Sequence, residues 1–458
     1  MAIALAKFKE VSPARLAAFN ILQQVEAGAF SSVLLAAEEP KLKHPDRALC
    51  HELVLGVLRW QSFLDKIIEH SSKRRIESLD SAVRIALRLG LYQLRILTRI
   101  PASAAVNESV SLVRAARLGS ATAFVNAVLR RAIREEEYDP ATEISDPLER
   151  IAIDTSHPVW LIERWTKAFG SAEAKAFAYA NYITPLTAFR VVRMRANEEE
   201  VLSKLEAAGA SLARSHVAKD AWRVSQATSM LRELSAAGQI YLQDEASQLV
   251  PQLLNVEPGE RVLDLCAAPG GKTTLMADRV GDEAMIIAAD RSPTRMATVI
   301  AVSSLHELKS IKPVILDATE QLPFKPGSFD KVLVDAPCSG TGTLRRNPEI
   351  RWRLSAADID AFAEKQKQIL SRAADAVRPG GRLVYSTCSV ERDENEDVIQ
   401  EFLARDDRFR VVDNLRTWPQ RHGCDGFFIA VFEKGTGLQD SRISRIDPVH
   451  LANHVNHV

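Results

Sequence analysis

Two cysteines, Cys338 and Cys388, lie just beyond short apolar runs in the last third of the chain. The runs, Val332–Val334 and Arg382–Val384, are typical of parallel strands that are buried on both faces. A thiol at the carboxyl end of such a strand faces the crevice in which open α/β sheets bind ligands. Because thiolates are strong nucleophiles, the pair predicts cysteine chemistry on a bound substrate.

Alternating strands and helices must position these thiols. From about residue 243 onward, short apolar runs alternate with helical patterns, which is typical of a doubly wound, Rossmann-like α/β sheet. The predicted strands are Arg261–Leu265, Met285–Asp290, Ile311–Asp317, Lys331–Asp335, Arg382–Ser386 and Phe427–Phe432.

The chain has 458 residues, so we expect several domains. Residues 8 to 135 carry apolar side chains at helical spacing, and the polar run Arg134–Pro140 interrupts that pattern. Residues 145 to 240 mix strand and helix patterns, which predicts a small α+β module. The predicted organisation is an all-α domain at 1–140, the α+β module at 141–240, the α/β domain at 241–434 and a polar tail at 435–458.

Basic side chains are concentrated in the helical region although the net charge is zero. Between Ser81 and Arg134 there are nine arginines and one acid, Glu108. Some recur at helical spacing and would form one basic stripe: Arg84, Arg88, Arg95 and Arg99. Such a stripe is either a solvated helix face or a phosphate-binding surface, and the preference for arginine over lysine favours phosphate. In the α+β module, Arg190, Arg193 and Arg195 would face either RNA or solvent.

The amino-acid composition argues against a membrane-spanning, a secreted and a disulfide-rich protein. The chain is 46% hydrophobic and 26% charged, and no run of 18 apolar residues occurs, so we expect no membrane-spanning helix. The first residues lack the features of a secretory signal. The five cysteines include no CxxC pair, which argues against a disulfide framework and a metal site. We therefore expect a cytoplasmic protein without a bound metal, and a monomer as the default state.

The first strand of the α/β domain ends in a turn of small residues that would let a ligand approach the backbone. Phosphate-binding loops require GxxxxGK[ST], but the first position here is Cys266, and the dinucleotide pattern GxGxxG is also absent. A nucleoside ligand without a long phosphate chain remains. The candidate cofactor-binding residues of this turn are Cys266, Ala267, Ala268, Pro269, Gly270, Gly271 and Lys272.

Acidic residues end the following three strands: Asp290 (followed by Arg291), Asp317 and Asp335. An acid at the second strand can accept hydrogen bonds from ribose hydroxyls, and one at the third from an adenine amine. A single strand-end aspartate is usually a cap or a surface residue. Three in succession after a glycine-rich turn instead favour S-adenosylmethionine as the ligand.

Several motifs of the α/β domain resemble those of the Nop2/Sun family of RNA cytosine-C5 methyltransferases. They are Asp264–Thr274, Asp335–Gly342, Tyr385–Ser389, Glu394–Glu396 and Asp425–Phe428. The segments Glu52–Arg59 and Phe124–Arg130 are similar to the antitermination factor NusB. The resemblance implies a class I methyltransferase domain behind a NusB-like RNA-binding domain. It also implies 16S rRNA as partner, naked or partly assembled, with cytosine 967 as target.

Methylation of cytosine C5 explains why thiols are needed. A thiolate that adds to C6 makes C5 enamine-like and able to attack a methyl sulfonium, and the base must leave its stack to be reached. Asp335 is the natural partner of N3 of that base. Spacing leaves open which thiol attacks, because DNA cytosine methyltransferases use a Pro-Cys motif, here Cys338. The family resemblance implies Cys388 as nucleophile, Cys338 in product release and an active-site role for Lys272.

Two alternatives differ in class or substrate. The chain could be a non-catalytic RNA-binding protein with a vestigial enzyme domain, or a methyltransferase that acts on tRNA. Intact strand-end acids and both cysteines argue against the first. The loop from Arg345 to Glu349 is expected to border the RNA entrance, and Asp393–Glu396 to cap the following helix.

Overall fold

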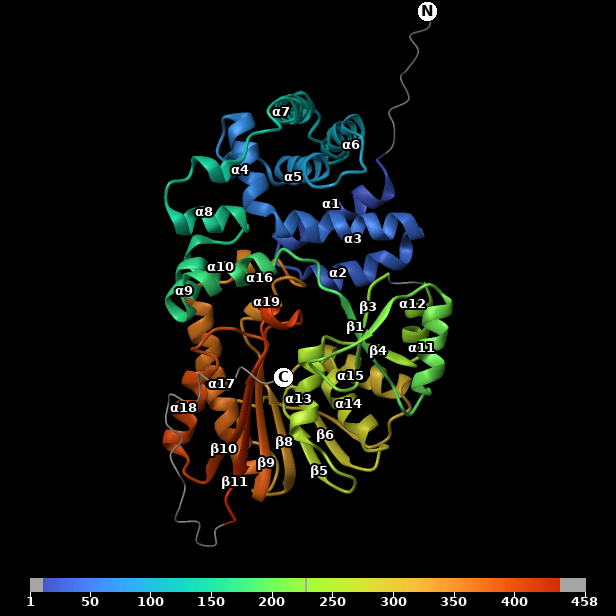
Figure 1. Ribbon diagram of the computed structural model, residues 1–458, viewed down its shortest axis with the longest axis vertical. Coiled ribbons are helices and arrows are strands. Elements are labelled where there is room, and N and C mark those ends of the chain that lie inside the picture. Colours follow the sequence, from blue (N-terminus) through green and yellow to red (C-terminus); the bar gives the residue numbers. More distant parts are fainter. Residues whose placement is uncertain (1–10, 227–228, 437–458) are drawn as a thin grey trace, which may run out of the picture. The chain divides into compact units, whose positions relative to one another are not determined.

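The computed structural model describes residues 11–226 and 229–436, and the chain divides into two compact units. Unit 1 comprises residues 1–183 and 344–353, and unit 2 comprises residues 184–343 and 354–458. The predicted polar tail lies outside the described residues from residue 437 onward. Figure 1 labels the helices and strands of both units.

Unit 1 is all-helical, as the spacing of apolar residues predicts for residues 8 to 135; its residues 145 to 183, predicted as part of the α+β module, are helical as well. Leu53, Ile67 and Leu87 are among the wholly buried side chains of its core, and Cys50 is buried there as a small apolar group. Its helices are α1 (Pro13–Glu26), α2 (Ser31–Glu38), α3 (His44–Arg59), α4 (Gln61–Ser72), α5 (Ser81–Arg95), α6 (Ala102–Ala115), α7 (Thr122–Arg134), α8 (Pro147–Asp154), α9 (Val159–Phe169), α10 (Ser171–Ala180) and α16 (Ile350–Arg353).

The expected basic stripe does not form a free surface. Arg88 is buried and makes ion pairs with Asp65 at 2.7 Å and Glu26 at 2.8 Å. Arg84 also pairs with Glu26, and Arg95 donates to backbone carbonyls at the end of α7. The prediction of one phosphate-binding stripe is therefore wrong for these three arginines. Acids distant in sequence neutralise Arg84 and Arg88, and backbone carbonyls accept the hydrogen bonds of Arg95.

A four-stranded antiparallel sheet begins unit 2, in the order β2-β3-β1-β4. Its elements are β1 (Thr187–Val191), α11 (Glu198–Ala207), β2 (Leu212–Arg214), β3 (Ala221–Val224), α12 (Ser229–Ala236) and β4 (Ile240–Leu242). Arg190 of β1 is wholly buried, with a guanidinium nitrogen 3.6 Å from Asp278, so the prediction that it faces RNA or solvent is wrong. Arg193 and Arg195 pair with Asp220 and Glu307.

The larger sheet of unit 2 has seven strands in the order β10-β11-β9-β8-β5-β6-β7. The six predicted strands are present, and β10 is an additional one; β11 runs antiparallel to both of its neighbours, so the sheet is mixed rather than parallel. The strands are β5 (Arg261–Asp264), β6 (Met285–Asp290), β7 (Ile311–Ile315), β8 (Phe329–Asp335), β9 (Val377–Thr387), β10 (Phe409–Arg416) and β11 (Phe428–Lys434).

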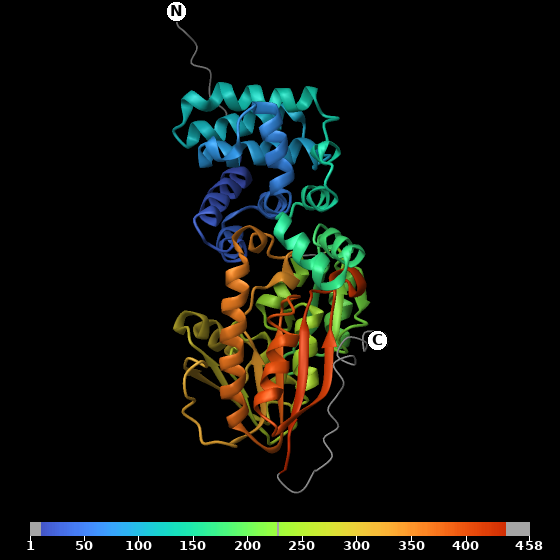
Figure 2. The same ribbon diagram turned by 90° about the vertical axis from the view of Figure 1, so that its left-hand side faces the viewer.

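Helices cover both faces of this sheet, which explains the apolar runs of its strands. Along β8, Val332 and Val334 pack on the side of α17 and α18, whereas Leu333 packs on the opposite side. Figure 2 shows α17 as the long orange helix beside the sheet. The helices are α13 (Glu245–Leu254), α14 (Gly271–Arg279), α15 (Pro293–Leu305), α17 (Ala356–Ala376), α18 (Glu396–Arg405) and α19 (Pro419–His422).

The register of two central strands brings the cysteine loops together. β8 and β9 are parallel neighbours, and Asp335 at the end of β8 lies opposite Ser386 of β9. Cys338 lies three positions after Asp335 and Cys388 two positions after Ser386, so both loops leave the sheet at the same edge. None of the described helices is long and apolar enough to cross a membrane.

Candidate active site

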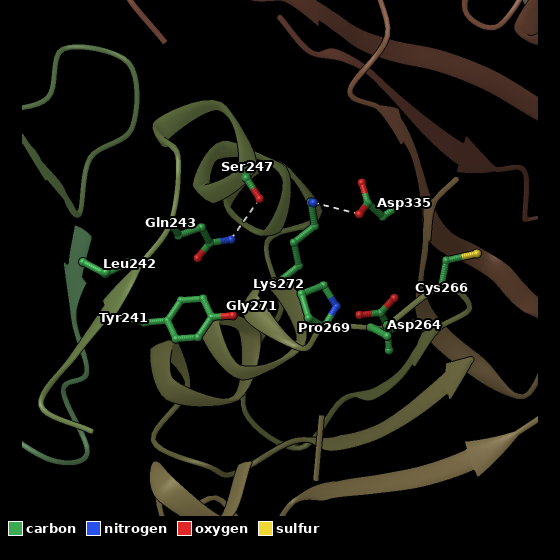
Figure 3. Close-up of a pocket in the computed structure, with 12 residues that line it drawn as sticks. Tyr241, Leu242, Gln243, Ser247, Asp264, Cys266, Pro269, Gly271, Lys272 and Asp335 are labelled. Atoms are coloured by element: carbon green, nitrogen blue, oxygen red, sulfur yellow. Dashed lines mark hydrogen bonds and ion pairs between the residues drawn. The ribbon is translucent and has the colours of Figure 1, made fainter. Parts of the chain in front are cut away.

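A cavity of about 180 Å³ lies at the carboxyl ends of β5 and β8. Figure 3 shows that residues from the turn after β5 face others from β4, from the turn after it and from α13. Its lining residues are Tyr241, Leu242, Gln243, Ser247, Asp264, Cys266, Ala267, Ala268, Pro269, Gly271, Lys272 and Asp335. Seven of these were candidate site residues from the sequence, and the cavity thus unites two of the predicted motifs.

Asp335 is held by two donors on the rim of this cavity. Lys272 Nζ donates to Oδ2 at 2.7 Å, and the Ser386 hydroxyl donates to Oδ1 at 2.7 Å. The Lys272 side chain reaches across from α14 toward Asp335 (Figure 3), and the ring centroid of Phe427 lies 5.2 Å from its ammonium. Burial alone lowers the pKa of Lys272, but the Asp335 carboxylate offsets this, so the pKa is raised and the ammonium stays charged.

Asp264 ends β5 in a fully buried position. Its Oδ2 accepts a hydrogen bond of 2.7 Å from the Thr273 hydroxyl, whereas Oδ1 is buried without a partner. Burial raises the pKa of Asp264 to about 7, against the opposing effect of Thr273. An unpartnered buried oxygen on the cavity wall suits a ligand that brings a donor or a positive charge.

The two thiols lie in contact. Cys338 Sγ and Cys388 Sγ are 3.3 Å apart, and both side chains are partly buried. The hydrogen bond with Cys388 is the largest cause of a strongly raised pKa at Cys338, and burial adds to it. Cys338 therefore keeps its proton, and either sulfur can donate the S–H that joins the pair.

Close backbone contact fixes the loop that carries Cys338. The Gly342 N–H donates to the Cys388 carbonyl at 2.9 Å, and the Gly426 N–H donates to the Gly342 carbonyl at 2.8 Å. A Cβ atom at Gly342 would lie 1.9 Å from the Gly426 carbonyl oxygen. Only glycine fits there, which accounts for the glycines in the motifs around residues 342 and 426.

Some predicted cofactor-binding residues lie outside the cavity lining. Asp290, at the end of β6, accepts from the Ser292 N–H and lies 3.6 Å from Arg295, and Arg291 follows it. Asp317 is exposed beyond β7 and accepts from Thr319, as a turn residue would. Gly270 begins α14 with a φ of 107° rather than lining the cavity.

Sequence reasoning missed the opposite wall of the cavity. Tyr241 lies in β4, Gln243 in the turn after it and Ser247 in α13, where the sequence predicts only a domain boundary. Their approach to α14 is close, since a Cβ atom at Gly271 would lie 2.8 Å from the Tyr241 ring. A polar run just before the first strand of the α/β domain was the available signal.

The predicted helix cap at Asp393–Glu396 is wrong for its two central residues. Asn395 is at the N-cap position of α18 but makes no capping hydrogen bond. Its side chain instead accepts from the Thr387 hydroxyl and donates to the Ser389 carbonyl. Glu394 is wholly buried against the two cysteine loops.

The loop from Arg345 to Glu349, which is predicted to border the RNA entrance, has buried charged side chains. Arg345 and Glu349 are buried within unit 1, where Glu349 accepts from the backbone N–H and hydroxyl of Ser31. Across the described ranges, no group of three or more His, Cys, Asp or Glu side chains is arranged to hold a metal ion.

Three family models match successive parts of the chain. The NusB family matches residues 12–134, the ferredoxin-like domain of RsmF/B-like methyltransferases matches 157–231, and 16S rRNA methyltransferase RsmB/F matches 251–433. The probable ribosomal RNA small subunit methyltransferase B of Synechocystis sp. is 36% identical over 446 residues, covering 92% of this chain and 99% of that protein. The chain belongs to the RsmB/F family of 16S rRNA methyltransferases.

Other members and a solved structure agree with this assignment. Ribosomal RNA small subunit methyltransferase B of Pseudomonas putida is 35% identical and covers 91% of this chain and 97% of its own. The crystal structure of PH0851 has a TM-score of 0.81 and 28% identity, covering 93% of this chain and all of that one. The predicted fold class of an RsmB/F protein is confirmed: a NusB-like all-α domain, a small α+β module of ferredoxin-like type and a Rossmann-like methyltransferase domain.

Proposed function

We propose that this RsmB/F protein transfers a methyl group from S-adenosylmethionine to C5 of one cytosine in 16S rRNA through a covalent adduct with Cys388. The observation that carries the proposal is the pair of sulfurs 3.3 Å apart, beside a charged Lys272–Asp335 pair at the same edge of the sheet. The sequence resemblance gives cytosine 967 as the first position to examine.

The residues present fit S-adenosylmethionine. Asp264, whose Oδ1 is buried without a hydrogen-bond partner, lines a cavity formed by a turn of small residues, where a cationic donor would be stabilised. Cys266 to Lys272 would hold the ligand, with Asp290, Arg291 and Asp317 contacting its nucleoside at the neighbouring strand ends. When bound, the ligand supplies a methyl group on a positively charged sulfur.

The two thiols would then have different roles. Cys388 adds to C6 of cytosine as a thiolate, and the charged ammonium of Lys272 interacts electrostatically with this cysteine. Asp335, oriented by Ser386 and Lys272, holds the protonated N3 edge of the base. After methyl transfer the C5 proton passes to water, the electrons of the C5–H bond re-form the C5–C6 double bond, and Cys388 leaves C6 as its thiolate; Cys338 assists this release.

Substitution of each cysteine tests the assignment. In Cys388→Ala we expect no turnover and no covalent RNA adduct, because the attacking sulfur is gone. In Cys338→Ala we expect the adduct to persist on denaturing gels, because release is blocked. An adduct that accumulates in Cys388→Ala and not in Cys338→Ala would reverse the two roles.

Bisulfite sequencing of total RNA from a deletion strain tests the substrate. One rRNA cytosine that loses its methyl group and regains it on complementation is the expected result. A lost tRNA cytosine would instead show a tRNA methyltransferase, and no lost site would favour a non-catalytic RNA-binding protein.

A further inference from the structure

One carboxylate joins the two cysteine loops. Glu394 Oε1 accepts from the Ser339 N–H at 2.8 Å, and Oε2 accepts from the hydroxyls of Ser339 and Ser389, each at 2.5 Å. Ser339 directly follows Cys338, and Ser389 directly follows Cys388. Glu394 therefore holds each loop at the residue next to its thiol.

Further contacts leave this carboxylate little freedom. Gln366 of α17 donates to Glu394 Oε1 at 3.0 Å and to the Pro337 carbonyl at 2.9 Å. The Tyr385 hydroxyl donates to the Glu394 carbonyl at 2.5 Å. Four donors on two oxygens match an ionised carboxylate, which only accepts hydrogen bonds, and all of them lie in a buried setting where charge-assisted bonds are strong.

The position of Glu394 matters because both thiols belong to loops rather than strands. Loops move more readily than the sheet that carries them, and a sulfur that has to attack and a sulfur that has to assist release need a fixed separation. The loops also meet where the Ser339 and Ser389 hydroxyls lie 3.1 Å apart and where Thr341 Oγ1 contacts the Ser389 hydroxyl and accepts from the Val390 N–H. To these neutral contacts and the backbone contacts at Gly342, Glu394 adds bonds from a carboxylate to the residue that follows each cysteine.

We infer that Glu394 is a positioning residue that sets the distance between the thiols of Cys338 and Cys388. This inference rests on the proposed function for its catalytic meaning, but the geometry it describes is measurable without methylation. Glu394 touches neither substrate nor reacting atoms and acts through Ser339 and Ser389.

Oxidation of the full-length protein by diamide measures the geometry directly. Diamide takes two electrons and two protons from the paired thiols, giving a Cys338–Cys388 disulfide and the hydrazine, and mass spectrometry of alkylated peptides quantifies the bond. In Glu394→Ala we expect the rate of this disulfide to fall at least tenfold. Glu396→Ala is the matched control, because Glu396 lies two residues away and pairs with Arg416 instead; we expect its rate within twofold of the unchanged protein.

Methylation assays on the same variants give the catalytic readout. We expect kcat to fall at least tenfold in Glu394→Ala with KM for RNA unchanged, and partial recovery in Glu394→Gln, whose amide oxygen still accepts from the Ser339 N–H. Should Glu394→Ala not fold, Glu394→Gln and the Ser339→Ala/Ser389→Ala double variant decide by the same two measurements.

The outcomes separate the inference from the proposed function. Unchanged disulfide rates in folded Glu394 variants would overturn the positioning role whatever the activity. A slower disulfide in a protein that methylates no RNA would leave the positioning role standing while the proposed function fails. A slower disulfide together with a lower kcat supports both.

Discussion

Charge in the cavity is organised around Asp335. This carboxylate receives an ammonium on one oxygen and a hydroxyl on the other, so it is oriented before any ligand arrives. Lys272 is in turn flanked by the ring of Phe427. Such preoriented donors are worth most in a site from which water is excluded.

Replacement of Lys272 by methionine keeps the length of the side chain and removes its charge. We expect methyl transfer to fall on the order of 100-fold, as for the loss of one preoriented catalytic donor. Lys331→Met is the control, since Lys331 lies on the same strand as Asp335 and pairs with Glu260 at 3.6 Å, away from the cavity. Equal losses of methyl transfer in Lys272→Met and Lys331→Met would show that removal of any positive charge lowers the activity, wherever the charge lies.

Asp264 predicts a pH dependence of stability with a definite sign. Its folded-state pKa is raised from 3.8 to about 7, so the neutral form is favoured in the folded protein. This stabilisation is complete below pH ~4 and is lost as the pH rises toward 7. In unfolding experiments at several pH values, Asp264→Asn should therefore gain stability relative to the unchanged protein between these limits.

Asp317→Asn serves as a control of opposite sign. Hydrogen bonds from the backbone and side chain of Thr319 lower the pKa of Asp317, so its contribution is present at neutral pH and is lost only as the solution becomes acidic. Its difference from the unchanged protein should be constant from pH ~5 to 7.5. A constant difference for Asp264→Asn over that range would contradict the assignment.

For single residues, the sequence predicts which side chains are reactive but not which groups they contact. Cys338, Cys388, Lys272 and Asp335 are recognisable from their motifs. The contact between the sulfurs depends on the register of β8 against β9, which no local pattern encodes. The sequence predicts only a helix cap at Glu394. Most of the groups that donate to its carboxylate come from distant parts of the chain and meet only in the folded protein.

Among the elements, the loops after β8 and β9 depend on backbone contact between Gly342 and Gly426. The contact leaves no room for a Cβ atom on either residue: at Gly426 it would lie 2.9 Å from the Gly342 Cα. The segment before β11 thus supports the loop that carries Cys338.

Gly342→Ala should displace this loop. We expect a loss of about 1–3 kcal/mol in the free energy of unfolding, as for other overpacked sites, and a larger fractional loss of activity than of stability. Gly435→Ala is the control, because a Cβ atom there would lie 3.6 Å from the Arg408 carbonyl, an ordinary contact distance. Chemical denaturation and methylation assays on both variants check this expectation.

The strands of the large sheet were predictable where both of their faces are buried. The central residues of these strands, Val332–Val334 in β8 and Val262 and Leu263 in β5, are apolar because helices cover both sides of the sheet. β10 was missed because only Phe409 among its eight residues is buried and its pairing with β11 is irregular between Val411 and Asp413. The antiparallel direction of β11 follows from chain connection and has no signature in a short apolar run.

For the molecule as a whole, the path of the chain between its units is the main departure from the predicted linear order of domains. The chain leaves unit 2 after Thr343, contributes residues 344–353 to unit 1 and then returns. Within unit 1, buried Arg351 donates to the carbonyls of Thr155, Ser156 and Leu344. The amino-acid composition does not change at either end of residues 344–353. A search of the sequence for domain boundaries therefore does not detect these ten residues.

Arg351→Met should loosen this segment. It removes donors from three buried carbonyls, so we expect a loss of a few kcal/mol in stability and faster tryptic cleavage at Arg345 and Arg346. Arg372→Met on the exposed side of α17 is the control. Peptide mapping after limited digestion distinguishes cleavage in the segment from general unfolding.

The excursion of residues 344–353 also limits how this protein can be rearranged. Unit 1 cannot be separated from the chain as a single amino-terminal fragment, because part of its interior lies in the sequence between the two cysteine motifs. A fusion of residues 1–183 to another catalytic domain would lack the indole of Trp352 that donates to the Leu58 carbonyl at 2.9 Å. It would also lack the Arg353 guanidinium, which donates to carbonyls in the last turn of α1 and just after it. Exchange of the helical domain between relatives must therefore transfer two separate stretches of the gene together.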